Sequence, residues 1–261
     1  MKKRGARVLA ALICLGMMGG VALAEDALYQ VSTLNALMLG LYDGVIPVEE
    51  YLRNGDTGLG TLDRLDGEMI TLDGVVYQVK DDGTVKVAED TQTIPFGVVT
   101  EFAPEVAETL VEPIVGMEAL AAYVDMLPPV AENKNRMYVV KLTGYFDTVR
   151  TRSVPAQDKP YQPLHEVTQT QSEFTFEALE GTVVGVYFPD YLASVNMHGW
   201  HFHFLSADKT MGGHLLDAEV ASGTIEVDTI DQLMLALPDT EDFASAHLGT
   251  DLAEAIESAE K

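Results

Sequence analysis

Residues 199–217 read GWHFHFLSADKTMGGHLLD, and polar and apolar side chains alternate along the first half of this stretch. Successive side chains of a β-strand point to opposite faces. His201 and His203 would therefore share one face, while Trp200, Phe202 and Phe204 would share the other. The pattern predicts a strand with one apolar face and one imidazole face.

A tight turn after this strand would bring a third histidine to the same place. If the hairpin is centred between Asp208 and Lys209, His214 lies directly opposite His203, with Cβ atoms about 5 Å apart. His198 has the wrong parity, and we expect it to lie outside the cluster. Three neutral imidazoles with an open fourth position are typical of a catalytic zinc site.

Other interpretations of these histidines stay open at this point. They would also fit an ordinary sheet surface, or a cluster that binds metal only adventitiously. Asp-Lys is not a favoured two-residue turn. In addition, Gly212 and Gly213 leave room for a β-bulge that would shift the register.

The rest of the chain predicts an α+β fold, because strand patterns alternate with helical ones. Strand patterns occupy residues 55–98, 136–152, 173–188, 199–217 and 223–227, with Asp-Gly turns at 66–67, 73–74 and 82–83. Helical patterns occupy 29–51, 104–127 and 229–237, followed by a charged helical tail. We expect two sheet-containing domains with mixed or antiparallel sheets, at residues 25–155 and 156–237, and a C-terminal tail at 238–261.

The first residues predict a secretory signal peptide, residues 1–24, with cleavage near Ala24 and export to a periplasm or the medium. Four basic residues precede an apolar run at 8–21 that is too short to span a membrane. The single cysteine, Cys14, lies within this leader, so thiolate ligands are excluded from the rest of the chain. The formal net charge of −25 argues against nucleic acid or an anionic membrane as a partner.

Two further positions combine charge with a strand pattern. Glu68 shares its face with Ile70 and Leu72. It lies either at the strand end in water or inside, as an acid suited to proton transfer. Arg150 and Arg152 share the face of another strand, either at a solvated end or as a clamp for an anionic substrate.

The sequence around these positions resembles the α-acetolactate decarboxylase family along nearly all of the chain after the leader. Several motifs carry the resemblance, in the order in which the family has them. They are YQVST at 29–33 with LYDG at 41–44, GLGTLD at 58–63 with LDGE at 65–68, TRSVP at 151–155, KPY at 159–161, and GWHFHF at 199–204 leading to GGH at 212–214.

The resemblance implies a zinc-dependent decarboxylation of 2-acetolactate to acetoin and CO2. It further implies a two-domain α/β protein, often dimeric, with Zn²⁺ held by His201, His203 and His214. A homodimer is therefore expected.

The resemblance also implies roles for residues that local sequence leaves open. Glu68 and Arg152 would be catalytic, with Arg152 rather than Arg150 as the motif arginine, and Thr61 would contact the substrate. Family members bring a glutamate from the extreme C-terminus into the site. That residue corresponds to Glu260, with Glu257 as the alternative.

Two other functions fit part of the pattern. A cupin-type oxygenase also uses His-x-His, but it needs a glutamate a few residues later, and residues 204–211 contain none. A non-enzymatic, secreted zinc-binding protein would explain the histidines and the acidic exterior. It would leave Glu68 and Arg152 without a function.

Overall fold

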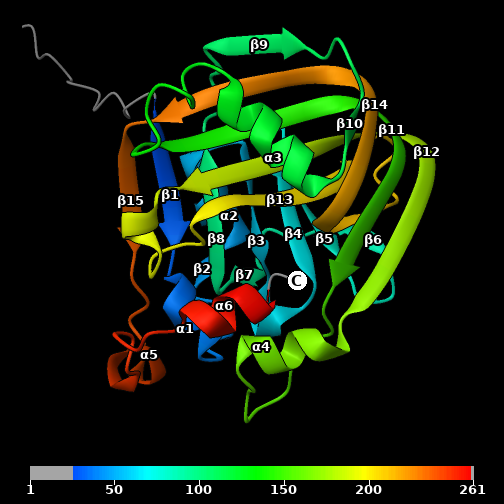
Figure 1. Cartoon of the computed structure of the whole chain (residues 1–261). Coiled ribbons are helices and arrows are strands. Elements are labelled where there is room, and N and C mark those ends of the chain that lie inside the picture. The colour runs from blue at the N-terminus through cyan, green and yellow to red at the C-terminus, as the bar shows by residue number, and fades with distance from the viewer. Residues whose placement is uncertain (1–25, 260–261) are drawn as a thin grey trace, which may run out of the picture.

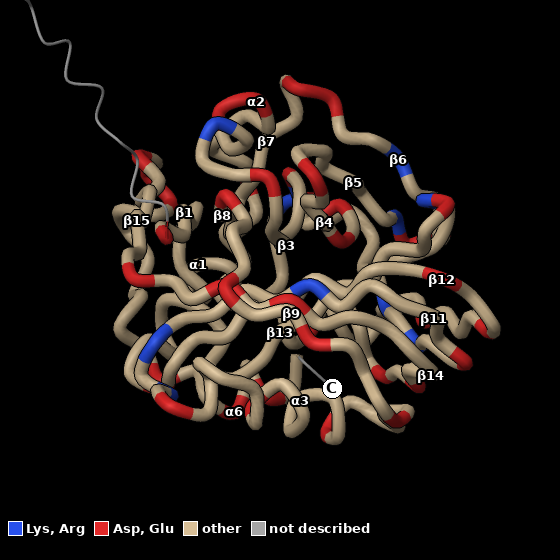
Figure 2. Tube along the Cα trace, turned by 90° about the horizontal axis from the view of Figure 1, so that it is seen from above, with Lys and Arg blue, Asp and Glu red and all other residues tan. Residues whose placement is uncertain are grey.

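Two β-sheets packed face to face form the body of the molecule in a computed structural model, which describes residues 26–259 (Figure 1). Figure 2, seen from above, shows the two layers side by side. The first sheet has seven strands. In spatial order they are β15 (Gln232–Ala236), β1 (Ala27–Val31), β8 (Phe96–Thr100), β3 (Thr57–Thr61), β4 (Glu68–Leu72), β5 (Val75–Val79) and β6 (Val85–Val87).

The second sheet is built on long antiparallel strands that curl into a ring. Its order is β10 (Ile114–Val115), β14 (Gly212–Ile230), β11 (Met137–Ser153), β12 (Ser172–Phe188) and β13 (Gly199–Ser206), and β9 (Val106–Thr109) pairs with β14. Because β13 pairs with both β12 and β14, the strands β11, β12, β13 and β14 close on themselves. A third, two-stranded sheet joins β2 (Ile46–Pro47) to β7 (Thr93–Ile94).

Short helices cover the ends of the sheets. Helix α3 (Met117–Met126) lies across the curled sheet, whereas α1 (Leu34–Met38), α4 (Leu164–Val167), α5 (Glu241–Ser245) and α6 (Ala253–Ala259) gather at the other end, as Figure 1 shows. Helix α2 (Val48–Tyr51) precedes β3. Single 3-10 turns are η1 (Leu52–Asn54), η2 (Asp63–Leu65), η3 (Thr168–Thr170) and η4 (Asp190–Leu192). Among the described residues, no helix is long and apolar enough to cross a bilayer.

The alternation of side chains along β13 determines which core each residue joins. Phe202 and Phe204 pack inside the curled sheet, in the cluster that Leu120 and Val124 of α3 complete. Leu205, on the opposite face, packs between the two sheets. The imidazole face of β13 is therefore directed to the interface between the two sheets.

Most strand predictions are confirmed, including the meander β3–β4–β5–β6 and the two long strands β11 and β12. Two of the helical predictions, 29–51 and 104–127, are wrong in part, and the third, 229–237, is wrong because no helix forms there. Residues 27–31 form β1 and residues 232–236 form β15, because these two segments pair in parallel with each other at the edge of the first sheet. Residues 106–109 form β9 rather than the start of a helix, because they pair with β14.

The mixed α+β class with antiparallel and mixed sheets is confirmed. Strand β11, which precedes residue 155, pairs along its length with β12 and β14, which follow it. The domain boundaries themselves stay predictions. The predicted leader and Glu260 lie outside the described residues.

Candidate metal centre and catalytic site

The predicted hairpin has the predicted register. Strands β13 and β14 pair His203 with His214, Phe204 with Gly213 and Leu205 with Gly212. The loop of residues 207–210 closes although Asp-Lys is an unfavoured turn. Its support comes from the Ser206 hydroxyl, which accepts hydrogen bonds from the backbone N–H groups of Thr210 and Met211. No bulge shifts the three pairs that β13 forms with β14.

Gly213 allows three strands to meet beside the histidines. It has a φ of 135°, and a Cβ atom built on it would lie 2.5 Å from the carbonyl oxygen of Arg152. A side chain at this position would push β11 away from β14. The next residue, His214, pairs with Arg152 on β11 as well as with His203 on β13.

The three predicted histidines point their ring nitrogens at one another. His201 Nε2 lies 2.9 Å from His214 Nδ1 and 3.2 Å from His203 Nε2. The three candidate ligand atoms all lie within 4.8 Å of one another. His198 is exposed and outside this group, as its parity predicts.

The histidines fit a borderline metal ion such as zinc. Zinc–nitrogen bonds of about 2.0–2.1 Å at tetrahedral angles place two nitrogens roughly 3.3 Å apart, close to the 2.9 and 3.2 Å that separate His201 Nε2 from the nitrogens of His214 and His203. Burial lowers the pKa of His203 and of His214 well below the usual imidazole value, and the charge of Arg152 acts in the same direction. Both rings are therefore in the neutral form that binds metals.

A backbone carbonyl orients the most buried of the three rings. His203 is 1% exposed, and its Nδ1–H donates a hydrogen bond of 2.9 Å to the carbonyl oxygen of Met69 on β4. This bond fixes the tautomer and leaves Nε2 available as a ligand. The first sheet thus positions a candidate ligand that the second sheet carries.

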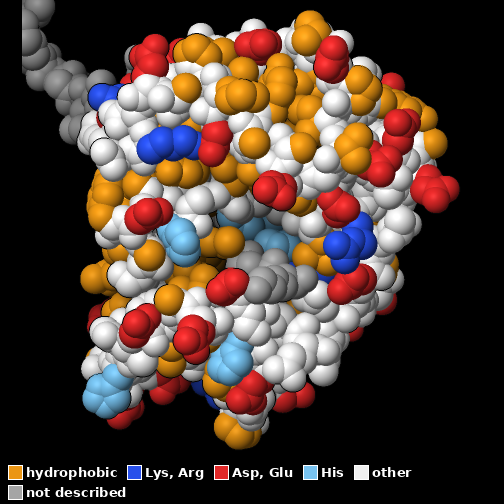
Figure 3. All heavy atoms as spheres, in the orientation of Figure 1, with side chains coloured by type: hydrophobic (Ala, Val, Ile, Leu, Met, Phe, Trp, Pro, Cys, Tyr) orange, Lys and Arg blue, Asp and Glu red, His pale blue; other side chains and the backbone are white. Residues whose placement is uncertain are grey.

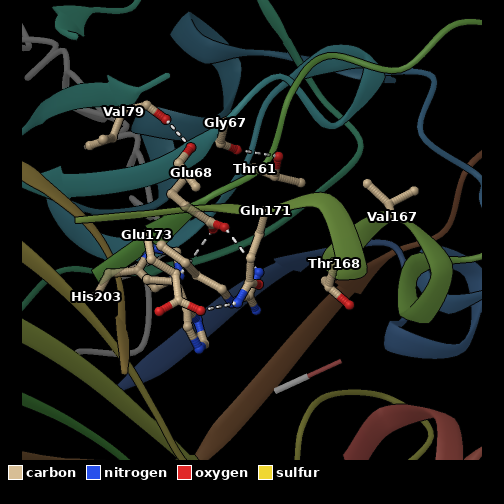
Figure 4. A network of polar contacts seen from close by, with 12 residues as sticks. Thr61, Gly67, Glu68, Val79, Val167, Thr168, Gln171, Glu173 and His203 are labelled. Atoms are coloured by element: carbon tan, nitrogen blue, oxygen red, sulfur yellow. Dashed lines mark hydrogen bonds and ion pairs between the residues drawn. The ribbon is translucent and has the colours of Figure 1, made fainter. Parts of the chain in front are cut away.

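Glu68 and Arg152 form a buried ion pair next to the histidines. Glu68 Oε1 lies 3.4 Å from Arg152 Nη1, and Glu68 Oε2 lies 3.5 Å from His203 Nε2. Figure 4 shows the Glu68 side chain reaching toward His203, with Thr61 and Gly67 beside it. Glu68 is 7% exposed, so of the two alternatives for this residue the inward-facing one holds.

Only one guanidinium nitrogen of Arg152 is engaged by Glu68. Arg152 is 4% exposed, and its buried Nε has no hydrogen-bond partner among the described residues. Arg150, by contrast, is half-exposed and pairs with Glu173 at the surface. The structure therefore brings Arg152, and not Arg150, to the histidines.

A cavity joins these polar groups to an apolar wall. Its polar lining comprises the three histidines, Glu68, Arg152 and Thr61, and Thr61 Oγ1 donates to the carbonyl oxygen of Gly67 at 2.7 Å. The apolar lining includes Leu34, Leu37, Leu65, Phe96, Val154 and Leu164. No local sequence signal distinguished these apolar residues from ordinary core.

The C-terminal segment packs against the same wall. Ile256 and Ala259 of α6 belong to a hydrophobic cluster with Leu34 and Leu164, which line the cavity. Glu257, on the same helix, is exposed. The view in Figure 3 shows a hollow in the middle of one face, with histidine side chains at its floor.

The comparisons with known proteins identify the family. The family model described as alpha-acetolactate decarboxylase matches residues 28–250. The chain belongs to this family. The resemblance inferred from the motifs is confirmed.

Relatives of this family match most of the chain. The alpha-acetolactate decarboxylase of Methanosarcina mazei is 43% identical over 239 residues, which cover 91% of this chain and 81% of the relative. That of Methylococcus capsulatus is 43% identical over 236 residues, which cover 90% and 89%. The crystal structure of alpha-acetolactate decarboxylase from Bacillus subtilis strain 168 superposes with a TM-score of 0.85 at 34% identity, covering 90% of this chain and 99% of that one.

Membership of the acetolactate decarboxylase family confirms that the chain is an enzyme of the decarboxylase class. It also disfavours the oxygenase and the non-enzymatic zinc protein.

Proposed function

We propose that this protein catalyses the zinc-dependent decarboxylation of 2-acetolactate to acetoin and CO2. The family supports the reaction. The observation that carries the assignment of roles is the buried Arg152, which lines the same cavity as three convergent imidazoles and whose Nε has no hydrogen-bond partner among the described residues. An anion-binding group and a metal-binding group at one cavity suit a substrate that is both a carboxylate and an oxygen chelator.

Arg152 would hold the substrate carboxylate. A guanidinium binds a carboxylate through two parallel N–H groups, and burial strengthens this attraction because little water competes with it. Among the described residues that line the cavity beside the histidines, Arg152 is the cationic side chain. In a chain of net charge −25, such a local positive site is what an anionic substrate needs.

His201, His203 and His214 would hold Zn²⁺. When bound, the ion supplies a Lewis acid for the ketone and hydroxyl oxygens of the substrate. The histidines contribute orientation, since His203 is fixed by the Met69 carbonyl and His214 by its place between β11 and β13.

Glu68 would deliver the proton that completes the formation of acetoin. When the bond to the carboxylate breaks, its electron pair stays on the adjacent carbon, and that carbon must gain a proton to give acetoin. Glu68 lies within reach of His203 and Arg152, so its acid would be held at the reacting end of the substrate.

Three further assignments belong to the same proposal. Thr61 would contact the substrate from the end of β3, and Glu260 would complete the site from the C-terminus, since α6 packs on the cavity wall just before it. We also propose that the chain is exported after cleavage near Ala24 and that it works as a homodimer.

The test is an assay of the purified protein with racemic 2-acetolactate, following acetoin and CO2 with and without a chelator. We expect equimolar acetoin and CO2, loss of both on chelation, and recovery when Zn²⁺ is added back. Turnover that persists unchanged in protein shown by elemental analysis to be free of metal would contradict zinc dependence. Absence of acetoin from the zinc-loaded protein would contradict the reaction itself.

A further inference from the structure

Two hydroxyl groups flank Arg152 in the sequence, and each donates a hydrogen bond to a backbone carbonyl oxygen. Thr151 Oγ1 donates to Gly212 on β14 at 2.9 Å, within the second sheet. Ser153 Oγ donates to Val79 on β5 at 2.7 Å, which joins the end of β11 to the first sheet. Both hydroxyl-bearing residues are fully buried. The backbone on either side of Arg152 is therefore held, and the Ser153 bond ties it to the opposite sheet.

The carbonyl that accepts this bond lies directly beside Glu68. Val79 is the ladder partner of Glu68 between β5 and β4, and Figure 4 shows the two residues next to each other. A Cβ atom built on Gly67, whose φ is 83°, would lie 2.1 Å from the same carbonyl oxygen. The glycine of this Asp-Gly turn leaves the space that the carbonyl needs. The bond from Ser153 thus ends at the residue opposite Glu68.

Four residues form a closed set of contacts around the ion pair. Ser153 follows Arg152 in the chain, and Val79 lies opposite Glu68 in the ladder. The ion pair itself is 3.4 Å long, whereas charge-assisted N–H···O bonds are usually about 2.7–2.9 Å. The Ser153 bond, at 2.7 Å, has the usual length for a hydroxyl donor. The hydroxyl bond is therefore the tighter of these two links between β11 and the first sheet.

We propose that Ser153 is a positioning residue for this reaction. Its hydroxyl sets the position of Arg152 relative to Glu68, and therefore the separation of the group that binds the carboxylate from the group that delivers the proton. This inference rests on the proposed function for those two roles. Catalytic groups gain much of their effect from correct geometry, and a displacement of about 1 Å can cost roughly a hundredfold in rate. Loss of one buried hydroxyl should therefore lower turnover although no group that touches the substrate is removed.

The kinetic experiment compares the zinc-loaded wild type with Ser153→Ala, and with Thr100→Val as a matched control. Thr100 is also fully buried, and its hydroxyl donates to the carbonyl oxygen of Ala27 at 3.0 Å within the first sheet. It is not among the described residues that line the cavity.

For Ser153→Ala we expect kcat for 2-acetolactate to fall at least about tenfold, with KM changed less than about threefold, because Arg152 would still bind the carboxylate but at the wrong place. For Thr100→Val we expect both constants to stay within about twofold of wild type, since its hydroxyl holds no part of the site. An unchanged kcat in Ser153→Ala, or equal losses of kcat in the two variants, would overturn the proposal.

A double-mutant cycle shows whether Ser153 acts through Arg152. It adds Arg152→Gln and the double variant Arg152→Gln with Ser153→Ala. If the hydroxyl works by placing the guanidinium, Ser153→Ala should lower kcat less than about threefold once the guanidinium is gone. The same loss of kcat in both backgrounds would indicate a general effect on the fold and would overturn the positioning role.

The position of Arg152 can also be measured without turnover, in crystal structures of the wild type and the two single variants, Ser153→Ala and Thr100→Val. In Ser153→Ala we expect Arg152 Nη1 and Glu68 Oε1 to be more than about 4 Å apart, beyond the limit of an ion pair. In Thr100→Val the wild-type separation should be kept. An unchanged separation in Ser153→Ala would overturn the proposal. If the wild type does not turn over 2-acetolactate, the proposed function fails, and these structures alone decide whether Ser153 positions Arg152.

Discussion

The interface between the two sheets buries charged groups at both of its ends, but the two ends differ in whether the buried charges have close partners. At one end Glu68, Arg152 and His203 form a compensated cluster, in which each charge has an opposite or neutral partner within 3.5 Å. At the other end, fourteen residues along β14 from His214, the carboxyl group of Asp228 is fully buried. Its Oδ2 accepts a hydrogen bond from the backbone of Ala103, but its Oδ1 has no partner among the described residues.

The electrostatic consequence is opposite at the two ends. Burial raises the pKa of Asp228 to about 7, and the nearby carboxylates of Glu105, Asp26 and Asp56 add to this, against the hydrogen bond from Ala103. Asp228 can avoid the cost of a buried charge by binding a proton, whereas the Arg152 guanidinium stays charged and must be paired. We therefore expect the compensated end to favour binding of an anion, and we expect the Asp228 end to make stability depend on pH.

The largest effect is expected from removing a ligand at the compensated end. His203→Ala should abolish zinc retention and lower acetoin formation by roughly a thousandfold or more, because the Lewis acid is lost. Metal content by elemental analysis and the acetoin assay measure both effects. His198→Ala is the control, since His198 is exposed and outside the cluster. Full activity of a metal-free His203→Ala protein would refute the assigned role.

Breaking the ion pair while leaving the ligands in place should have the next largest effect. For Arg152→Gln we expect retained zinc but a loss of kcat/KM on the order of a hundredfold to a thousandfold, since the carboxylate clamp is gone. Arg150→Gln removes an exposed pair with Glu173 and should change kcat/KM by less than about twofold. Similar losses in the two variants would show that Arg152 does not bind the substrate.

Gly213 tests whether the strand convergence itself is needed. Gly213→Ala places a Cβ against the Arg152 carbonyl, and we expect it to cost roughly 3 kcal/mol of unfolding free energy and much of the activity. Gly74→Ala is the matched control. Gly74 also has a positive φ, of 75°, but a Cβ there would meet nothing within 4 Å, so it should cost about 1 kcal/mol. Denaturant titration of both variants measures the difference, and equal costs would contradict the steric argument.

The Asp228 end gives the smallest effect, and it has a defined sign. Because the folded-state pKa is raised, the contribution of Asp228 to stability is present below its unfolded pKa near 4 and is lost as pH rises through about 7. Asp228→Asn removes this dependence. The unfolding free energy of the variant relative to wild type should therefore increase by roughly 2 to 3 kcal/mol from pH 5 to pH 8.

Both chains should be unfolded by denaturant at several pH values in the presence of chelator, so that release of metal by the histidines does not contribute. A difference between the two that is independent of pH would show that Asp228 stays ionised in the folded state.

The sequence predicted local features well and non-local ones poorly. Strand parity and the hairpin register placed His201, His203 and His214 correctly, because each depends on the period of a strand and on one turn. Residues 29–31 of β1 and residues 232–236 were predicted to be helical. Their β structure depends on parallel pairing between segments about 200 positions apart, and local periodicity contains no trace of that contact.

The same difference between local and distant contacts applies to the site. The charged members Glu68 and Arg152 stood out because a charge in a strand pattern is unusual, but their contact joins positions 84 apart in the sequence. The apolar wall of the cavity could not be predicted, and neither could the β-bulge of β14 at Leu216, which has no ladder partner on β11. Leucines there look like core residues, and the extra residue of a bulge is defined only by the partner strand.

The hairpin of β13 and β14, which is part of the closed ring of β11, β12, β13 and β14, also predicts the order in which the parts of the site form during folding. The three imidazoles come from one hairpin and lie within fourteen positions of one another, so a local event assembles them. The pair of Glu68 and Arg152 needs a contact across 84 positions, and the Met69 carbonyl meets His203 across 134. Local contacts form faster than distant ones. In a refolding experiment we therefore expect metal uptake to precede recovery of turnover, with a lag that measures the docking of the two sheets.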